Sequence, residues 1–161
     1  MKLQIDLNSP ELLGDIAFKI TESILDGCKK EDKKNEKNGD TKKFTKNMKD
    51  DKNKDKESIE YSLTKSQIRK FYSEFKLIEK KLPANGKIPD DLYGQIKLLK
   101  AKAIYNKSRK NSALPEPFVE FIEFCVDSIK YEDNGNRQTF LNICKLFETF
   151  VGYSSAYPLG D

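Results

Sequence analysis

The chain has 161 residues, of which 35% are charged and 37% apolar, and its formal net charge at pH 7 is +4. This length allows one domain with a hydrophobic core and excludes two domains of ordinary size. Because no run approaches the roughly 18 apolar residues of a membrane span and the first seven residues lack a secretion signal, we expect a cytoplasmic protein with no membrane partner.

The first predicted element is a helix between Ser9 and Gly27, within an N-terminal segment at residues 1–28. Ser9 is a capping residue, Pro10 suits the first helical position, and Gly27 can end the helix. One face is apolar, which predicts that the helix packs on the core: its members are Leu13, Ile16, Ala17, Ile20 and Ile24.

Residues 29–57 contain twelve Lys and eight Asp or Glu. Such a segment has too few apolar residues to offset the entropy lost on ordering, so we predict a disordered linker. A basic linker can also touch RNA, but the interleaved acids favour a solvated tether.

Residues 58–161 are predicted to form the helical core. Thr64 and Gln67 have the spacing of a capping box and open a helix that runs to about Leu82. Its apolar stripe comprises Ile68, Phe71, Phe75, Ile78 and Leu82, and its basic side comprises Lys65, Arg69, Lys76 and Lys80.

The next helix begins near Pro89 and contains the stretch LLKAKAIYNKSRK at 98–110. It carries two apolar stripes, one of Leu92, Ile96, Leu99 and Ala103 and one of Leu98, Ala101 and Tyr105. Two apolar faces imply two packing partners. Lys102 and Arg109 flank Tyr105 on one ridge.

Two more helices are predicted at about Glu116–Tyr131 and Arg137–Tyr153, followed by a frayed tail. Their inward residues are Phe118, Phe121, Ile122, Cys125 and Ile129 in the first, and Phe140, Ile143, Cys144, Phe147 and Val151 in the second. The cysteines on these faces, Cys125 and Cys144, are predicted to be buried, reduced thiols. The fold class is all-α, a small bundle of about five helices.

Catalysis is not expected, because the sequence has no histidine and therefore lacks the commonest general base and metal ligand. It also has no P-loop, no Gly-rich phosphate loop and no zinc spacing, so we predict no cofactor and no metal. Glu120, Glu123 and Asp127 lie three and four residues apart, but a solvated acidic face explains them better than a metal site does.

Charge is unevenly distributed along the core. Residues 64–110 hold thirteen basic and four acidic side chains, a net charge of +9, whereas residues 111–161 hold three and eight, a net charge of −5. The basic part is what a polyanion partner would require, but on charge alone lysines that only solvate helix faces explain it equally well. The acidic part suggests a contact with a basic surface, including a head-to-tail contact between copies of the chain.

Three motifs resemble one known family in order and spacing: LTKSQIRKFYSEF (Leu63–Phe75), LLKAKAIYNKSR (Leu98–Arg109) and ICKLFETFVGY (Ile143–Tyr153). They are similar to the Csm-type small subunit of type III-A CRISPR effector complexes. The matching positions are Thr64, Ser66, Gln67, Ile68, Arg69, Lys102, Tyr105, Arg109, Phe147, Glu148 and Tyr153. The chain departs from the family at Ala101, where many members have proline, at Lys107 and Ser108, and in its longer Lys-rich linker.

The resemblance implies a non-catalytic subunit of an antiviral ribonucleoprotein, stacked along its inner ridge. The implied partners are guide RNA and target RNA, the large catalytic subunit, the guide-holding backbone subunits, and copies of the chain itself. On this reading the RNA-binding residues are Lys65, Arg69, Lys76, Lys102 and Arg109, and the subunit-interface residues are Leu98, Ala101 and Tyr105. For Tyr105 alone, ordinary core packing with a satisfied hydroxyl is at least as good an explanation.

Two other functions stay open. One is a helical adaptor that binds only protein through its acidic half. The other, a metal-dependent hydrolase built on Glu120, Glu123 and Asp127, is disfavoured because the sequence offers no second cluster of ligands.

Overall fold

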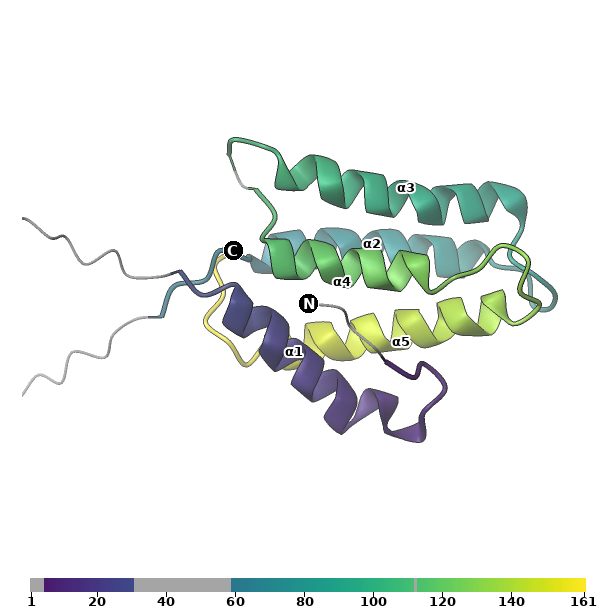
Figure 1. The fold of residues 1–161 in the computed structure, drawn as a ribbon, viewed down its shortest axis with the longest axis horizontal. Coiled ribbons are helices and arrows are strands. Elements are labelled where there is room, and N and C mark those ends of the chain that lie inside the picture. The colour runs from purple at the N-terminus through teal and green to yellow at the C-terminus, as the bar shows by residue number, and fades with distance from the viewer. Residues whose placement is uncertain (1–4, 31–58, 112) are drawn as a thin grey trace, which may run out of the picture.

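The computed structural model describes residues 5–30, 59–111 and 113–161, which form a bundle of helices (Figure 1). Its elements are a 3₁₀ turn η1 (Pro10–Leu13) and the helices α1 (Asp15–Gly27), α2 (Lys65–Lys81), α3 (Asp90–Lys107), α4 (Glu116–Asp127) and α5 (Asn136–Ser154). The described residues contain no strand beyond two isolated bridges. The prediction of an all-α fold with about five helices is confirmed.

The helices pack in a ring. α1 lies against α5, α5 against α2, α2 against α3, α3 against α4, and α4 against α1 again. The centre of the ring is aromatic: Phe75, Phe118, Phe121, Phe140, Phe147 and Phe150 are all fully buried. Their rings meet edge-to-face, stacked or tilted, with centroids 5.1 to 6.3 Å apart, so the core is held by close aromatic packing.

The inward faces predicted for α2, α4 and α5 are confirmed, with Leu82 and Val151 half-buried rather than buried. α4 and α5 each bury more than the one apolar stripe that was predicted. Val119, Val126, Leu146 and Phe150 are buried as well.

The N-terminal helix is not continuous. The Ser9 hydroxyl accepts a hydrogen bond from the Glu11 amide, as predicted for a cap. Only the 3₁₀ turn η1 follows it, and the helical conformation is interrupted at Gly14 before α1 begins. The break changes the register of the apolar face, so Leu12 is buried and Leu13 is 42% exposed. The placement of Leu13 on the inner face was therefore wrong.

Gly27 lies where the end of α1 meets the start of α4. A Cβ atom built on Gly27 would stand 2.7 Å from Cγ of Pro117. A larger residue would push the two helices apart, which gives this glycine a packing role as well as a position at the helix end.

The ends of α4 and α5 differ from the predictions. α4 stops at Asp127, not Tyr131. At this end the Lys97 and Tyr93 side chains of α3 donate to the Val126 and Ile129 carbonyls, and the chain then turns. The tail after α5 is not frayed. Leu159 is buried, and the Gly160 carbonyl accepts a bond from the Lys65 amide at the start of α2.

Two loops at one end of the bundle are joined by Asn136, which is 1% exposed. Its side-chain oxygen accepts the Ile88 amide at 3.1 Å, and its side-chain nitrogen donates to the Tyr131 carbonyl at 3.3 Å. This residue fixes the α2–α3 connection against the α4–α5 connection.

The predicted linker, residues 29–57, lies outside the described residues except for its first two. Lys29 pairs with Tyr61 in an antiparallel bridge, and the Lys30 amide donates to the Glu60 carbonyl at 2.9 Å. The described residues on either side of this gap, Lys30 and Glu60, are therefore held side by side. None of the helices in the described part of the chain has the length and apolar character that crossing a bilayer requires.

Candidate nucleic-acid interface

The start of α2 is fixed by its cap. The Thr64 hydroxyl accepts the Gln67 amide at 3.2 Å, and the Gln67 side chain accepts the Thr64 amide at 3.0 Å. This capping box satisfies helix donors that would otherwise lack partners. It also sets the positions of Lys65 and Arg69 in the first two turns.

One groove runs between α2 and the end of α5. It has a volume of about 160 Å³ and is lined by Lys65, Ile68, Arg69, Val151, Ser154 and Ser155. We call it the α2–α5 groove. Its apolar floor and its two cations suit a ligand that carries negative charge.

A larger groove lies on the other side of α2, where α3 passes. It has a volume of about 340 Å³ and is lined by Lys70, Phe71, Glu74, Lys102, Tyr105, Asn106 and Arg109. We call it the α2–α3 groove. Three of its side chains are cations and one is an acid.

The five predicted RNA-binding residues therefore do not share one surface. Lys65 and Arg69 line the α2–α5 groove, and Lys102 and Arg109 line the α2–α3 groove. Lys76 lines neither. Both grooves border the first half of α2, so a single extended ligand that crosses α2 can reach both.

These five residues also differ in whether an ion pair within the chain already neutralises their charge. Lys102 binds Glu74 at 2.8 Å, and Lys76 binds Glu79 and lies 3.7 Å from Glu148. The hydrogen bond to Glu79 raises the pKa of Lys76. By contrast, Lys65, Arg69 and Arg109 have no carboxylate of the described residues within ion-pair distance, so their charge is available to a partner.

Sequence reasoning missed Lys70 and Asn106. Lys70 does not belong to the basic side of α2 that the helical spacing indicates, since it points toward α3. Its part in the groove depends on where α3 crosses α2, and no pattern within α2 alone contains that information.

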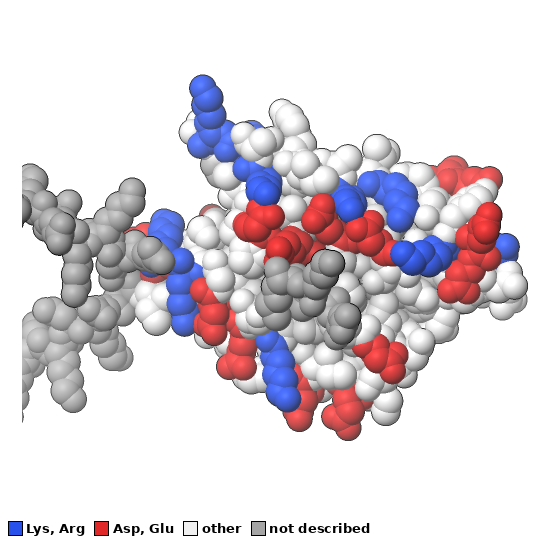
Figure 2. Space-filling view, in the orientation of Figure 1, with Lys and Arg blue, Asp and Glu red and all other residues white. Residues whose placement is uncertain are grey.

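Much of the acidic half is paired within the chain. Lys100 binds Asp127 at 2.6 Å and lies 3.7 Å from Glu123, and Lys107 binds Glu116. Figure 2 shows acidic and basic side chains side by side along the border of α3 and α4. Among the described residues, no group of three or more His, Cys, Asp or Glu side chains is placed to hold a metal ion.

The two apolar stripes of α3 have different surroundings. The first is buried against the bundle, whereas Leu98 is 57% exposed and Tyr105 is 68% exposed. Core packing of Tyr105 was therefore the wrong alternative. We define the outer face of α3 as Gly94, Leu98, Ala101, Ile104 and Tyr105, all of them exposed.

The three cysteines are reduced and buried, as predicted for Cys125 and Cys144. Burial raises the pKa of the Cys28 and Cys144 thiols to about 12 and moves the pKa of Cys125 in the same direction. These thiols are protonated at neutral pH and are not nucleophiles.

The sequence model of one protein family, described as Csm2 Type III-A, matches residues 41–159. Comparison with curated proteins and with solved structures gives no match.

Proposed function

The chain belongs to the Csm2 Type III-A family, the small subunit of the type III-A CRISPR effector complex, and from this premise we propose that it holds guide and target RNA by their backbone. In this proposal the subunit is non-catalytic, works in antiviral defence in the cytoplasm, and stacks with other copies along the inner ridge of the complex.

The observation that supports RNA contact most strongly is the placement of unpaired cations beside two grooves. Lys65, Arg69 and Arg109 have no acidic partner among the described residues, and they border grooves on both sides of α2. α2 begins, and α3 and α5 end, at the same end of the bundle (Figure 1). A nucleic-acid backbone crossing this end meets cations from α2, from α3 and from the loop that follows α3.

The two arginines suit phosphate. A guanidinium presents several donors in a plane and can grip a phosphate through two of them. Neither groove is lined by an array of amide side chains of the kind that reads base edges, since Asn106 is the one amide in the α2–α3 groove. Base pairing between guide and target supplies sequence choice in such complexes, so the subunit needs only backbone and shape contacts.

The remaining parts of the proposal concern protein partners. Leu98, Ala101 and Tyr105 lie exposed on the outer face of α3 and are the proposed contacts to a neighbouring subunit. The neighbours are copies of the chain, the backbone subunits that hold the guide, and the large catalytic subunit.

Titration of the purified protein with a guide–target RNA duplex at several salt concentrations tests the RNA part. Neutralised phosphates release counterions, so affinity must fall steeply as salt rises. No RNA binding at low salt, with normal recovery of the other effector subunits in a pull-down, would instead favour the protein-only adaptor, for which the exposed outer face of α3 is the supporting feature.

A further inference from the structure

Tyr105 lies near the end of α3 with its aromatic ring uncovered. The other tyrosines each pack on a neighbouring aromatic ring, in the pairs Tyr61 with Tyr157, Tyr72 with Phe147, Tyr93 with Tyr131, and Tyr153 with Phe18. Within the part of the chain that the structure describes, Tyr105 has neither a ring neighbour nor a hydrogen bond from its hydroxyl, and it is 68% exposed. An open aromatic face beside a groove is a surface on which a planar ligand can stack.

The α2–α3 groove, which Tyr105 lines, has walls that the fold holds in place. On the α2 side Phe71 is 3% exposed, and its ring packs edge-to-face on that of Phe118 with the centroids 5.9 Å apart. Lys102 of α3 binds Glu74 of α2 at 2.8 Å, so an ion pair joins the two walls. The groove is therefore formed before a ligand arrives, which lowers the entropy cost of binding.

The groove has the size and polarity of a site for one nucleotide. Its volume of about 340 Å³ lies at the lower end of the range of about 300 to 1,000 Å³ for small-molecule pockets, so it cannot enclose a length of duplex. Asn106 is half-buried in it, and its side-chain amide has no hydrogen-bond partner among the described residues. An amide offers both donors and an acceptor, as the edge of a nucleobase requires.

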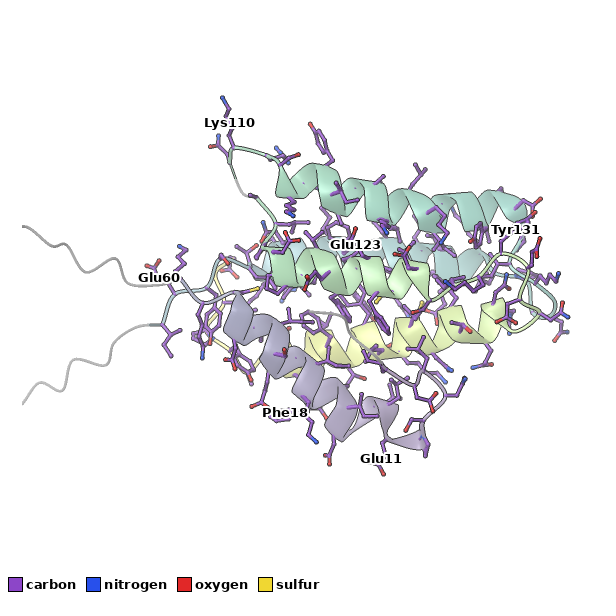
Figure 3. All side chains as sticks on the ribbon, in the orientation of Figure 1. Glu11, Phe18, Glu60, Lys110, Glu123 and Tyr131 are labelled. Atoms are coloured by element: carbon purple, nitrogen blue, oxygen red, sulfur yellow. The ribbon has the colours of Figure 1, made fainter. Side chains whose placement is uncertain are left out.

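Cations surround the uncovered ring. Lys70 and Arg109 line the groove without an ion-pair partner among the described residues. The loop after α3 adds Lys110, which projects outward from the bundle (Figure 3). An aromatic face, a free amide and cations placed together are the features with which proteins hold unpaired nucleotides.

We propose that the α2–α3 groove holds one unpaired nucleotide of a bound RNA. Its base stacks on Tyr105, the base edge contacts Asn106, and the flanking phosphates lie at Lys70 and Arg109. All four bases can stack on a tyrosine ring, so the groove detects that a nucleotide is unpaired and does not read which base it carries.

The inference rests on the RNA contact proposed above, and it adds a base contact to the contacts with the backbone. Tyr105 borders both the groove and the outer face of α3. Because its ring has two faces, a base can cover one of them while a neighbouring subunit contacts the other.

Three RNA duplexes that differ at one position test the base contact. One is fully paired, one carries a single unpaired nucleotide, and one carries an abasic residue at the same point. The last two have the same phosphates, so their comparison isolates the base. By fluorescence anisotropy at one salt concentration, the full chain should bind the unpaired nucleotide about 5- to 100-fold more tightly than the abasic residue, the effect of one base–aromatic stack. All four bases should show this advantage.

Variants assign the advantage to the groove. Tyr105→Ala should abolish it, whereas Tyr105→Phe keeps the ring and should keep the advantage. Asn106→Leu should reduce it by about 2- to 10-fold, because a hydrogen bond to the base edge is lost. Leu98→Ala is the matched control: it changes an exposed residue of the outer face of α3 that does not line the groove, and the advantage should not change. None of these variants removes a charge, so each should keep the salt dependence of the wild type.

Equal affinity of the wild type for the unpaired nucleotide and for the abasic residue would overturn the inference. If all three duplexes then still bound with a steep salt dependence, the proposed backbone contact would stand. An advantage that survives in Tyr105→Ala would also overturn the inference, since the base would be held elsewhere. No binding of any duplex at low salt would overturn both this inference and the proposed function.

Discussion

Arg109 carries a charge at the rim of the α2–α3 groove that no acid of the described residues neutralises. Arg109→Gln should weaken RNA binding about equally for all sequences, because a phosphate contact carries no sequence information. The plot of log affinity against log salt should become less steep by about 0.7 to 0.9. The melting temperature should not change, since no ion pair is lost.

The control for this variant is Lys145→Gln, which removes a charge from an exposed position on α5 outside both grooves. It should leave the salt slope unchanged. An unchanged RNA affinity in Arg109→Gln, with a lowered melting temperature, would assign Arg109 a structural role and remove it from the site.

Asn136 shows how a single polar residue can fix two loops. Asn136→Ala leaves the Ile88 amide and the Tyr131 carbonyl without their partner. Leaving a buried polar group unpaired costs about 1 to 3 kcal/mol, so the free energy of unfolding in urea should fall by about that amount. Asn134→Ala, at an exposed position in the same connection, should have no such effect. Equal losses in the two variants would contradict the role of the Asn136 hydrogen bonds.

The buried thiols predict a dependence of stability on alkaline pH. The pKa of Cys28 and of Cys144 is raised from 9.0 to about 12 in the fold. Between these values the unfolded chain binds fewer protons than the folded one, so stability falls as pH rises above 9. Thermal melting across this range should show a steeper decline for the wild type than for Cys28→Ala/Cys144→Ala. Parallel declines would show that other groups control the pH response.

At the scale of elements, the sequence predicted which segments are helical and could not predict how they end or cross. The capping box of Thr64 and Gln67 is a local pattern, and it marks the start of α2 correctly. The early end of α4 depends on α3, whose side chains donate to the carbonyls at that end. The break at Gly14 follows a turn that buries Leu12 in the core. The division of the basic residues between two grooves depends on the crossing of α2 with α3 and α5, which helical spacing within α2 does not specify.

The pairing of Lys30 with Glu60 predicts that a short turn can replace the residues between them. Lys30 and Glu60 are joined by a backbone hydrogen bond next to the antiparallel bridge of Lys29 and Tyr61. Replacing residues 31–59 with Asn-Gly, the residues preferred in a two-residue hairpin turn, should preserve this pairing. The shortened protein should keep its helical circular dichroism, its melting temperature and its RNA salt slope. A loss of helicity would show that the replaced segment supports the fold.

At the scale of the whole molecule, the charge asymmetry of the sequence is partly neutralised within the fold. Lys100 and Lys107 of α3 pair with acids of α4, and Lys76 of α2 lies near Glu148 of α5. The sequence correctly indicated a basic part and an acidic part, but counting charges could not show which of them the bundle pairs. The cations left over gather around the first half of α2 and the end of α3, and the RNA proposal rests on those.

The most direct test of that proposal is the salt slope of the double variant Arg69→Gln/Arg109→Gln, measured on a guide–target RNA duplex beside the wild type. The two arginines lie in different grooves, so a backbone that crosses α2 should lose both contacts. The plot of log affinity against log salt should then become less steep by about 1.4 to 1.8, twice the change for one contact. A slope equal to that of the wild type, in a double variant that melts at the same temperature, would contradict RNA contact through these grooves.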